Sequence, residues 1–224
     1  MPAIADFRDR VSQMLVDVAG AIYADGLIDE SLRHALGEYS AVCPQALETV
    51  VNVLADGREI ELSGLAGLLE VTEVYWPFDS AATEETWPPN RVRGWRVFWD
   101  ITDPVLHFIQ WDGEQPQAGD EARIWYTAKH TIEGLDAEAV TSVSIAHESL
   151  IVLGAAGYTA LSRATELIET AGIDLYQVGL LGTMGTKYVR EFQSKLEALR
   201  KVEARRGPAW GQGWALDKWD SGHS

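Results

Sequence analysis

Apolar residues at the start of the chain recur at steps of three and four, which is the spacing of one face of an α-helix. The first such stripe consists of Ile4, Phe7, Val11, Met14, Leu15, Val18 and Ile22. After the break at Asp25-Gly26, a second stripe consists of Ile28, Leu32, Ala35, Leu36 and Tyr39. Pro44 then ends the helical pattern, because proline lacks the N–H that a helix interior needs. The chain is therefore predicted to open as a hairpin of two helices, each with one buried face.

The segment that follows changes to the pattern of β-strands. Residues 48–54 and 58–62 flank Asp56-Gly57, a dipeptide that supplies the positive φ angles of a tight turn, so we expect these two strands to pair as a hairpin. Further strands are predicted at 69–76, 94–100, 105–111 and 121–132. Together these segments predict one small antiparallel sheet of about six strands.

Helical spacing returns at residue 145, and the first helix that follows contains several small residues that leave little side-chain volume on it. These small residues are Gly154, Ala155, Ala156, Gly157 and Ala160. A glycine inside a helix costs about 1 kcal/mol relative to alanine. We therefore expect a neighbouring helix to approach this one closely, and local fraying of the helix is the alternative. Residues 172–185 predict an irregular connector, and a last helix is predicted from about Met184 to Arg205.

The whole pattern predicts an α+β fold in which an antiparallel β lobe is inserted into a helical scaffold. Its predicted parts are an N-terminal helical hairpin at 1–43, a β lobe at 44–143, C-terminal helices at 144–206 that pack on the hairpin, and an extended tail at 207–224. No segment repeats at a fixed period, so a solenoid is not expected.

The chain is strongly acidic, with a formal net charge of −16 over 224 residues. The acidity is uneven: residues 1–43 carry seven acids and three bases, 44–142 carry eighteen acids and six bases, and 143–224 carry nine of each. Such a charge argues against binding the phosphate backbone of a nucleic acid. Solubility alone would explain it, and a surface that must repel polyanions is the functional interpretation.

The number of cysteines and the length of the apolar runs indicate in which compartment the protein assembles. Cys43 is the single cysteine, so an intrachain disulfide is impossible and assembly in a reducing compartment is expected. No apolar run reaches the length of a membrane-spanning helix, and the first residues lack the apolar core of a signal peptide. We therefore expect no membrane partner.

Sequence signatures of catalysis are missing from the chain. His147-Glu148 has Ile151 where a zinc protease motif needs its second histidine, and the five histidines show no metal-ligand spacing. The glycine-rich segment 179–185 lacks the phosphate-loop spacing and is interpreted as a linker. Cys43 follows a helix rather than preceding one, which does not favour a nucleophile. We expect no metal, no cofactor and no enzymatic activity, although paired carboxylates of a glycosidase type cannot be judged from sequence because their separation is spatial.

The last residues form a tail rich in tryptophan. Trp210, Trp214, Leu216 and Trp219 lie there among glycine and proline, in a stretch too short to build its own core. Tryptophan is a frequent anchor at protein interfaces, so burial by another protein is the favoured interpretation and folding back onto the chain's own body is the alternative. The preceding helix ends in Arg200, Lys201, Arg205 and Arg206, which could contact an acidic partner. We expect the tail to be ordered only in an assembly.

Six further tryptophans lie in or near the predicted sheet: Trp76, Trp87, Trp95, Trp99, Trp111 and Trp125. Aromatic residues on strands most often form the core or pair across strands. The alternative is a sugar-stacking face, for which Trp95 and Trp99 are the candidates.

Two segments resemble the head–tail connector (adaptor) proteins of tailed bacteriophages of the long-tailed type. Residues 27–44 (LIDESLRHALGEYSAVCP) resemble the second helix of such adaptors, which leads into their strands. Residues 118–164 resemble a stretch of neck and connector proteins in which an aromatic-Tyr-Thr strand and a His-Thr-Ile-Glu-Gly-Leu-Asp turn precede a small-residue helix. The inserted β lobe is larger than in the mostly helical adaptors.

This resemblance implies a structural virion protein of the neck, assembled in the host cytoplasm. It implies a ring, commonly of twelve copies, that lies below the portal protein, contacts the tail or a second neck protein, and lets DNA pass without specific binding. On this view the tail and the basic helix end bind the portal, and Gly154, Ala155, Gly157 and Ala160 form the contact between ring subunits. The runner-up functions are a virion carbohydrate-binding module and another tail or neck interaction protein.

Overall fold

The protein folds as two compact units. The computed structural model describes residues 2–17, 22–81, 91–99, 103–109, 115–168 and 175–206. One unit, here called the helical unit, contains residues 1–43 together with 130–224, and the other, the β unit, contains 44–129. The α+β class is confirmed, with a β lobe inserted between two pairs of helices.

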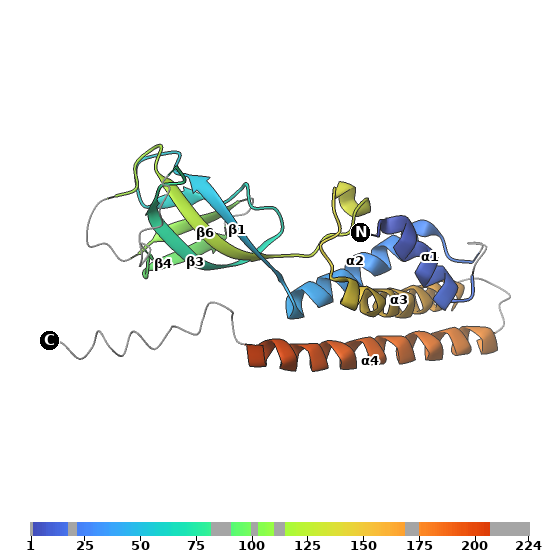
Figure 1. The fold of residues 1–224 in the computed structure, drawn as a ribbon. Coiled ribbons are helices and arrows are strands. Elements are labelled where there is room, and N and C mark those ends of the chain that lie inside the picture. The colour runs from blue at the N-terminus through green and yellow to red at the C-terminus, as the bar shows by residue number, and fades with distance from the viewer. Residues whose placement is uncertain are drawn as a thin grey trace. The chain divides into compact units, whose positions relative to one another are not determined.

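In its described residues the helical unit contains four α-helices (Figure 1): α1 (Ile4–Met14), α2 (Asp25–Val42), α3 (Glu148–Ile168) and α4 (Leu175–Arg206). Helix α3 lies between α2 and α4 and contacts α1 as well. Most of α3 is buried, including Ile151 and Ala155, neither of which is exposed at all. Among the described residues, no helix combines the length and the apolar character needed to cross a bilayer.

Helices α3 and α4 pack at very short distance because glycine replaces side chains on both. A Cβ atom added to Gly157 would lie 2.9 Å from the backbone nitrogen of Val189, and one added to Gly185 would lie 2.9 Å from the carbonyl oxygen of Gly157. A Cβ atom on Gly154 would meet the ring of Phe192 at 3.0 Å. The close approach predicted from the small residues is therefore confirmed, and the neighbouring helix is α4 of the same chain.

The predicted start of the last helix is wrong. Helix α4 begins at Leu175, so the segment 175–185 is helical and not an irregular connector. The three glycines of this segment led to the prediction of a connector, because glycine has a low intrinsic helix propensity. Burial outweighs that preference here: Val178 is 7% exposed, and Gly185 packs against Leu161 of α3.

The first helix is shorter than its apolar stripe predicts. Helix α1 ends at Met14, and Val16 has a positive φ of 61° with an 84% exposed side chain. The buried carboxylate of Asp17 accepts hydrogen bonds from the backbone N–H groups of Ile22 and Tyr23, at 2.8 and 2.9 Å. These bonds turn the chain toward α2 and take Ile22 out of the helix. Val18 lies outside the described residues.

Over the residues that the structure describes, the β unit consists of two three-stranded antiparallel sheets and not of one sheet. The first has the order β1-β6-β3 and the second the order β2-β5-β4. The strands are β1 (Gln45–Asn52), β2 (Glu59–Glu61), β3 (Leu68–Phe78), β4 (Trp95–Trp99), β5 (Pro104–Phe108) and β6 (Glu121–Ala128). Apolar residues from both sheets, among them Val74, Leu106 and Ile124, form one core between them.

The hairpin predicted around Asp56-Gly57 is wrong. Strand β1 pairs along its whole length with β6, from Gln45 opposite Ala128 to Asn52 opposite Glu121, and β2 pairs with β5. Gly57 does have a positive φ, of 146°, but the backbone of Val53 is already bonded to Asp120 and Gly119. Local turn chemistry thus reverses the chain without deciding which strand becomes the partner.

Residues 130–143, which the sequence assigned to the β lobe, belong to the helical unit. Ile132, Leu135 and Val143 are buried in the helical core. The backbone of this segment is also hydrogen-bonded to the start of α1, since the N–H of Ile4 donates to the carbonyl oxygen of Glu133 at 2.8 Å. The predicted boundary at 143 therefore lies past the point where the chain re-enters the helical core.

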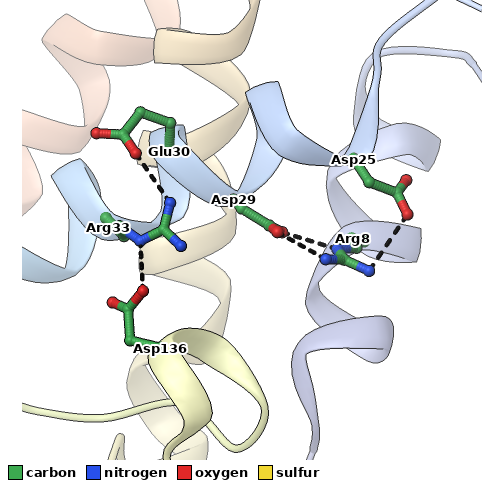
Figure 2. A network of polar contacts seen from close by, with 6 residues as sticks. All are labelled: Arg8, Asp25, Asp29, Glu30, Arg33 and Asp136. Carbon is green, nitrogen blue, oxygen red and sulfur yellow. Dashed lines mark hydrogen bonds and ion pairs between the residues drawn. The ribbon is translucent and has the colours of Figure 1, made fainter.

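A polar network ties α1, α2 and the short 3-10 helix η1 (Leu135–Ala137) together (Figure 2). Arg8 of α1 forms a two-pronged bond with Asp29 of α2, at 2.7 and 2.6 Å, and reaches Asp25 at 3.2 Å. Arg33 of α2 bonds Glu30 at 2.9 Å and Asp136 of η1 at 2.8 Å. Bidentate arginine–carboxylate geometry fixes orientation as well as distance.

The glycine contact gives a stability prediction. The Gly157→Ala variant should lose about 1–3 kcal/mol of unfolding free energy, because its Cβ would overlap the backbone of Val189. The matched control is Gly179→Ala in the same helix pair, where no atom lies within 4 Å of an added Cβ. That variant should gain roughly 0.5–1 kcal/mol from helix propensity. Denaturant unfolding measures both, and equal effects of the two substitutions would contradict the packing described.

Candidate partner-docking surface at the end of the last helix

The predicted docking residues lie at the C-terminal end of α4. Arg200 and Lys201 are exposed there, and Lys201 lies 3.8 Å from Glu197 one turn earlier. Cations at this end of a helix also complement its dipole. The side chains of Arg205 and Arg206, and the tail residues Trp210, Trp214, Leu216 and Trp219, lie outside the described residues. Their roles in docking stay predictions.

A shallow groove lies beside these cations. Its walls come from the start of α3 and from the last turns of α4, and it is lined by Ala146, His147, Ser149, Leu150, Lys195, Ala198, Leu199 and Val202. Val202 is 43% exposed, and Ile145 next to the groove is 78% exposed. Apolar side chains together with arginine are enriched at protein-binding surfaces. The sequence interpretation missed this groove, because residues 145–150 and 195–202 meet only in the folded unit.

Buried polar residues lie next to the groove, where the chain leaves and re-enters the helical unit. The Nε2 atom of His130 lies 2.9 Å from the carbonyl oxygen of Cys43. Its Nδ1 atom lies 3.1 Å from the carbonyl oxygen of Ser142 and 3.0 Å from the hydroxyl of the same residue. The hydroxyl of Tyr39 lies 2.8 Å from Nδ1 of His147, which lines the groove. These bonds hold both connecting segments against the helical core.

Burial controls the protonation of this cluster. It lowers the pKa of His130 below its ordinary value, although the hydrogen bonds to the backbone of Cys43 and Ser142 oppose that shift. Burial likewise raises the pKa of Tyr39, and its hydrogen bond with Cys43 adds to the shift. At neutral pH the side chains of His130 and Tyr39 are therefore uncharged.

The ring contact predicted for α3 is not supported by the position of its residues. Gly154, Ala155, Gly157 and Ala160 are all buried within the helical unit. Gly154 and Gly157 face Phe192 and Val189 of α4 in the same chain. Their small size is thus explained by packing within one subunit, which leaves no surface of these residues for a neighbouring copy.

The sheet tryptophans do not form an exposed platform. Trp95 packs against the core of the β unit, whereas Trp99 at the other end of β4 is 60% exposed. Trp76 stacks near Phe108, with ring centroids 6.1 Å apart, and Trp125 lies under the guanidinium of Arg123. Trp87 and Trp111 lie outside the described residues. The described part of the sheets therefore gives the carbohydrate-binding alternative no particular support.

The described residues also contain no cluster of three or more histidine, cysteine, aspartate or glutamate side chains that could hold a metal ion.

One buried carboxylate, that of Glu73, is 6% exposed and is bound by Arg91 at 2.9 Å and by the hydroxyl of Tyr75. Burial, followed by the bond to Glu73, raises the pKa of Tyr75 to about 12. The ion pair of Glu73 with Arg91 links β3 to the segment that carries Arg91 and thereby stabilises the sheet edge.

The chain matches no protein-family model and no curated protein. Its structure is similar to chains in solved particles. One is in the neck of an empty GTA particle computed with C6 symmetry, with a TM-score of 0.31 and 20% identity, covering 82% of this chain and 88% of that one. Another is in the virion of a native gene transfer agent (GTA) particle, with a TM-score of 0.32, 20% identity and coverage of 81% and 86%.

A third is in the neck of a native GTA particle computed with C12 symmetry, with a TM-score of 0.30, 20% identity and coverage of 76% and 80%. Scores at this level report a loose similarity between chains. The function proposed below therefore rests on the residues of this protein.

The position of His130 gives a pH prediction. Its pKa in the folded chain lies below the ordinary value of 6.5, so the unfolded chain binds the proton first. Stability should be fully present above about pH 6.5 and should fall as the pH drops through the folded pKa. We expect the His130→Gln variant to lose less stability than the wild type between about pH 7.5 and about pH 5.5. Denaturant unfolding at each pH measures this dependence, and an equal loss of stability in both proteins would contradict the prediction.

Proposed function

We propose that this chain is a structural subunit of a virion neck, a head–tail adaptor that forms a ring below the portal and continues the DNA channel toward the tail. The observation that carries the proposal is the end of α4. There a helix fixed on the core by glycine contacts carries exposed cations to the point where the tryptophan-rich tail begins. A firmly held helix followed by an apolar tail is suited to anchoring one protein on another.

The composition of the docking surface supports a protein partner. The groove beside Val202 offers apolar area, and Lys195, Arg200 and Lys201 offer positive charge around it. We propose that the portal protein receives Trp210, Trp214, Leu216 and Trp219 in apolar pockets, while an acidic rim contacts Arg200, Lys201, Arg205 and Arg206. The tail or a second neck protein would bind the opposite side of the ring. Assembly takes place in the host cytoplasm on this proposal.

Energetics favour a ring over a single docking subunit. A buried tryptophan removes roughly 150–250 Å² from water, worth about 4–6 kcal/mol at about 25 cal/mol per Å². Ordering each tail residue costs about 1–2 kcal/mol of backbone entropy, so one tail is close to break-even. When identical tails belong to one ring, the later ones bind intramolecularly, which raises the overall affinity without new contacts.

Tail docking has a direct test. A triple variant, Trp210→Ala with Trp214→Ala and Trp219→Ala, should fold like the wild type but lose attachment to portal-bearing heads by at least about tenfold. Sedimentation of heads with bound protein measures attachment. The control is Trp99→Ala, which removes an exposed tryptophan from the β unit and should leave attachment unchanged. Normal attachment of the triple variant would overturn the docking proposal.

Passage of DNA without binding has a separate test. With a net charge of −16, the full chain should not retard duplex DNA in a gel at about 0.15 M salt, since counterion release requires cationic contacts. Retardation that disappears when Arg200 and Lys201 are both changed to Glu would show a DNA-binding helix end. Such a result would replace the proposed portal contact of these residues.

A further inference from the structure

The N-terminal half of α4 carries an open groove that no element of the described chain fills. The groove measures about 570 Å³ and is lined by Leu161, Gly179, Gly182, Thr183, Thr186, Lys187 and Arg190. Tyr176 and Leu180 on the same helix are 72% and 54% exposed. The hydroxyls of Thr183 and Thr186 donate to the carbonyls of Gly179 and Gly182, at 2.8 and 2.7 Å, so their donor capacity is used within the helix.

Two glycines of this groove have no packing role within the part of the chain that the structure describes. Gly185 is explained by α3, because an added Cβ would lie 2.8 Å from Leu161. No atom lies within 4 Å of a Cβ added to Gly179 or to Gly182. Each of these residues weakens α4 relative to alanine. A partner helix lying close to the backbone of α4 would explain why side chains are missing at both positions.

The rim of the groove is positively charged. Lys187 and Arg190 stand one turn apart, and both are exposed. The partner surface must therefore carry negative charge as well as a flat, small-residue face. Within this chain the acidic residues are concentrated before residue 143, whereas the last segment is neutral overall. A second copy of the chain can therefore supply the complementary surface.

Helix α2 has such a face. The network of Figure 2 sets four carboxylates against two guanidinium groups, so it retains two negative charges. Its most exposed members are Asp25 and Glu30, with side chains 73% and 74% exposed. Gly26 lies one turn before Glu30, and a Cβ added to it would meet no atom within 4 Å. The face of α2 that carries Gly26 and Glu30 thus combines negative charge with a side-chain-free position, because residues four apart lie on the same side of a helix.

We infer that the contact between ring subunits places the face of α2 that carries Gly26 and Glu30 in the α4 groove of the next copy, with Glu30 facing Lys187 and Arg190. This inference rests on the ring assembly of the proposed function. The contact joins two different surfaces of the chain, so it is head-to-tail and can close into a ring. Both surfaces belong to the helical unit and both helices pack on α3, which fixes the angle between successive copies.

Cysteine cross-linking tests the contact in the full chain. In a Cys43→Ser background, the double variant Gly26→Cys with Gly182→Cys should give a ladder of dimers, trimers and larger species with a short bismaleimide. Both positions have open space around them, so the subunit should fold normally. Each single-cysteine variant should give no species larger than a dimer. A double variant without a ladder, at concentrations up to those of precipitation, would overturn the inference.

Charge reversal tests the recognition. Adding Arg190→Glu should raise the protein concentration needed for half-maximal cross-linking by about tenfold, since one reversed charge pair changes affinity by about that factor. A compensating Glu30→Arg should restore the ladder. The control is Arg96→Glu on β4, which changes the net charge equally and should leave the ladder intact. Loss of the ladder with Arg96→Glu as well, or no rescue by Glu30→Arg, would contradict the proposed pairing.

The two proposals fail separately. If the tail tryptophans prove necessary for attachment while no ladder forms, the adaptor function stands and the α2–α4 contact is wrong. If the ladder forms while tail variants attach normally, the self-contact stands and the docking of the tail is wrong.

Discussion

The helical unit depends on the close contact between α3 and α4. Gly157 and Gly185 let the two backbones approach to distances at which any side chain would overlap, and Phe192 then fits over Gly154. This contact extends the helix of α4 through a glycine-rich stretch that would otherwise be weak. It also fixes the direction in which α4 carries its exposed groove, its cations and the following tail. The close packing of α3 on α4 thus determines where the surfaces proposed for binding lie on the helical unit.

A second set of constraints keeps the two units distinct. The chain passes into the β unit after Cys43 and returns to the helical unit at His130. Hydrogen bonds that involve the ring of His130 and the hydroxyls of Ser40 and Ser142 hold Cys43 and His130 in the helical unit. The arginines of Figure 2 then join α1, α2 and η1 into one body. A chain with a large insertion can in this way keep its helices packed as one unit.

Physical periodicity explains which predictions succeed. The stripes that contain Phe7 and Leu32 are long and regular, so their helices were predictable, and the inserted β lobe followed from its alternating pattern and turns. Strand pairing was not predictable, because Asp56-Gly57 is compatible with a hairpin and β1 nevertheless pairs with β6, which lies far away in the sequence. The role of Gly154 and Gly157 was half-predictable: their size indicates a close neighbour but does not say whether it belongs to the same chain.

The sequence by itself determined the fold class, the acidic character, the position of the basic helix end and the tryptophan-rich tail, because periodicity, charge and composition are local properties. Only the tertiary structure decided that Gly185 is buried while Gly179 and Gly182 remain open, although all three follow one another in one helix. It also decided that Asp25 and Glu30 keep unbalanced charge beside Arg8 and Arg33. Such differences arise from which surfaces the other helices cover, and burial depends on contacts between residues distant in sequence.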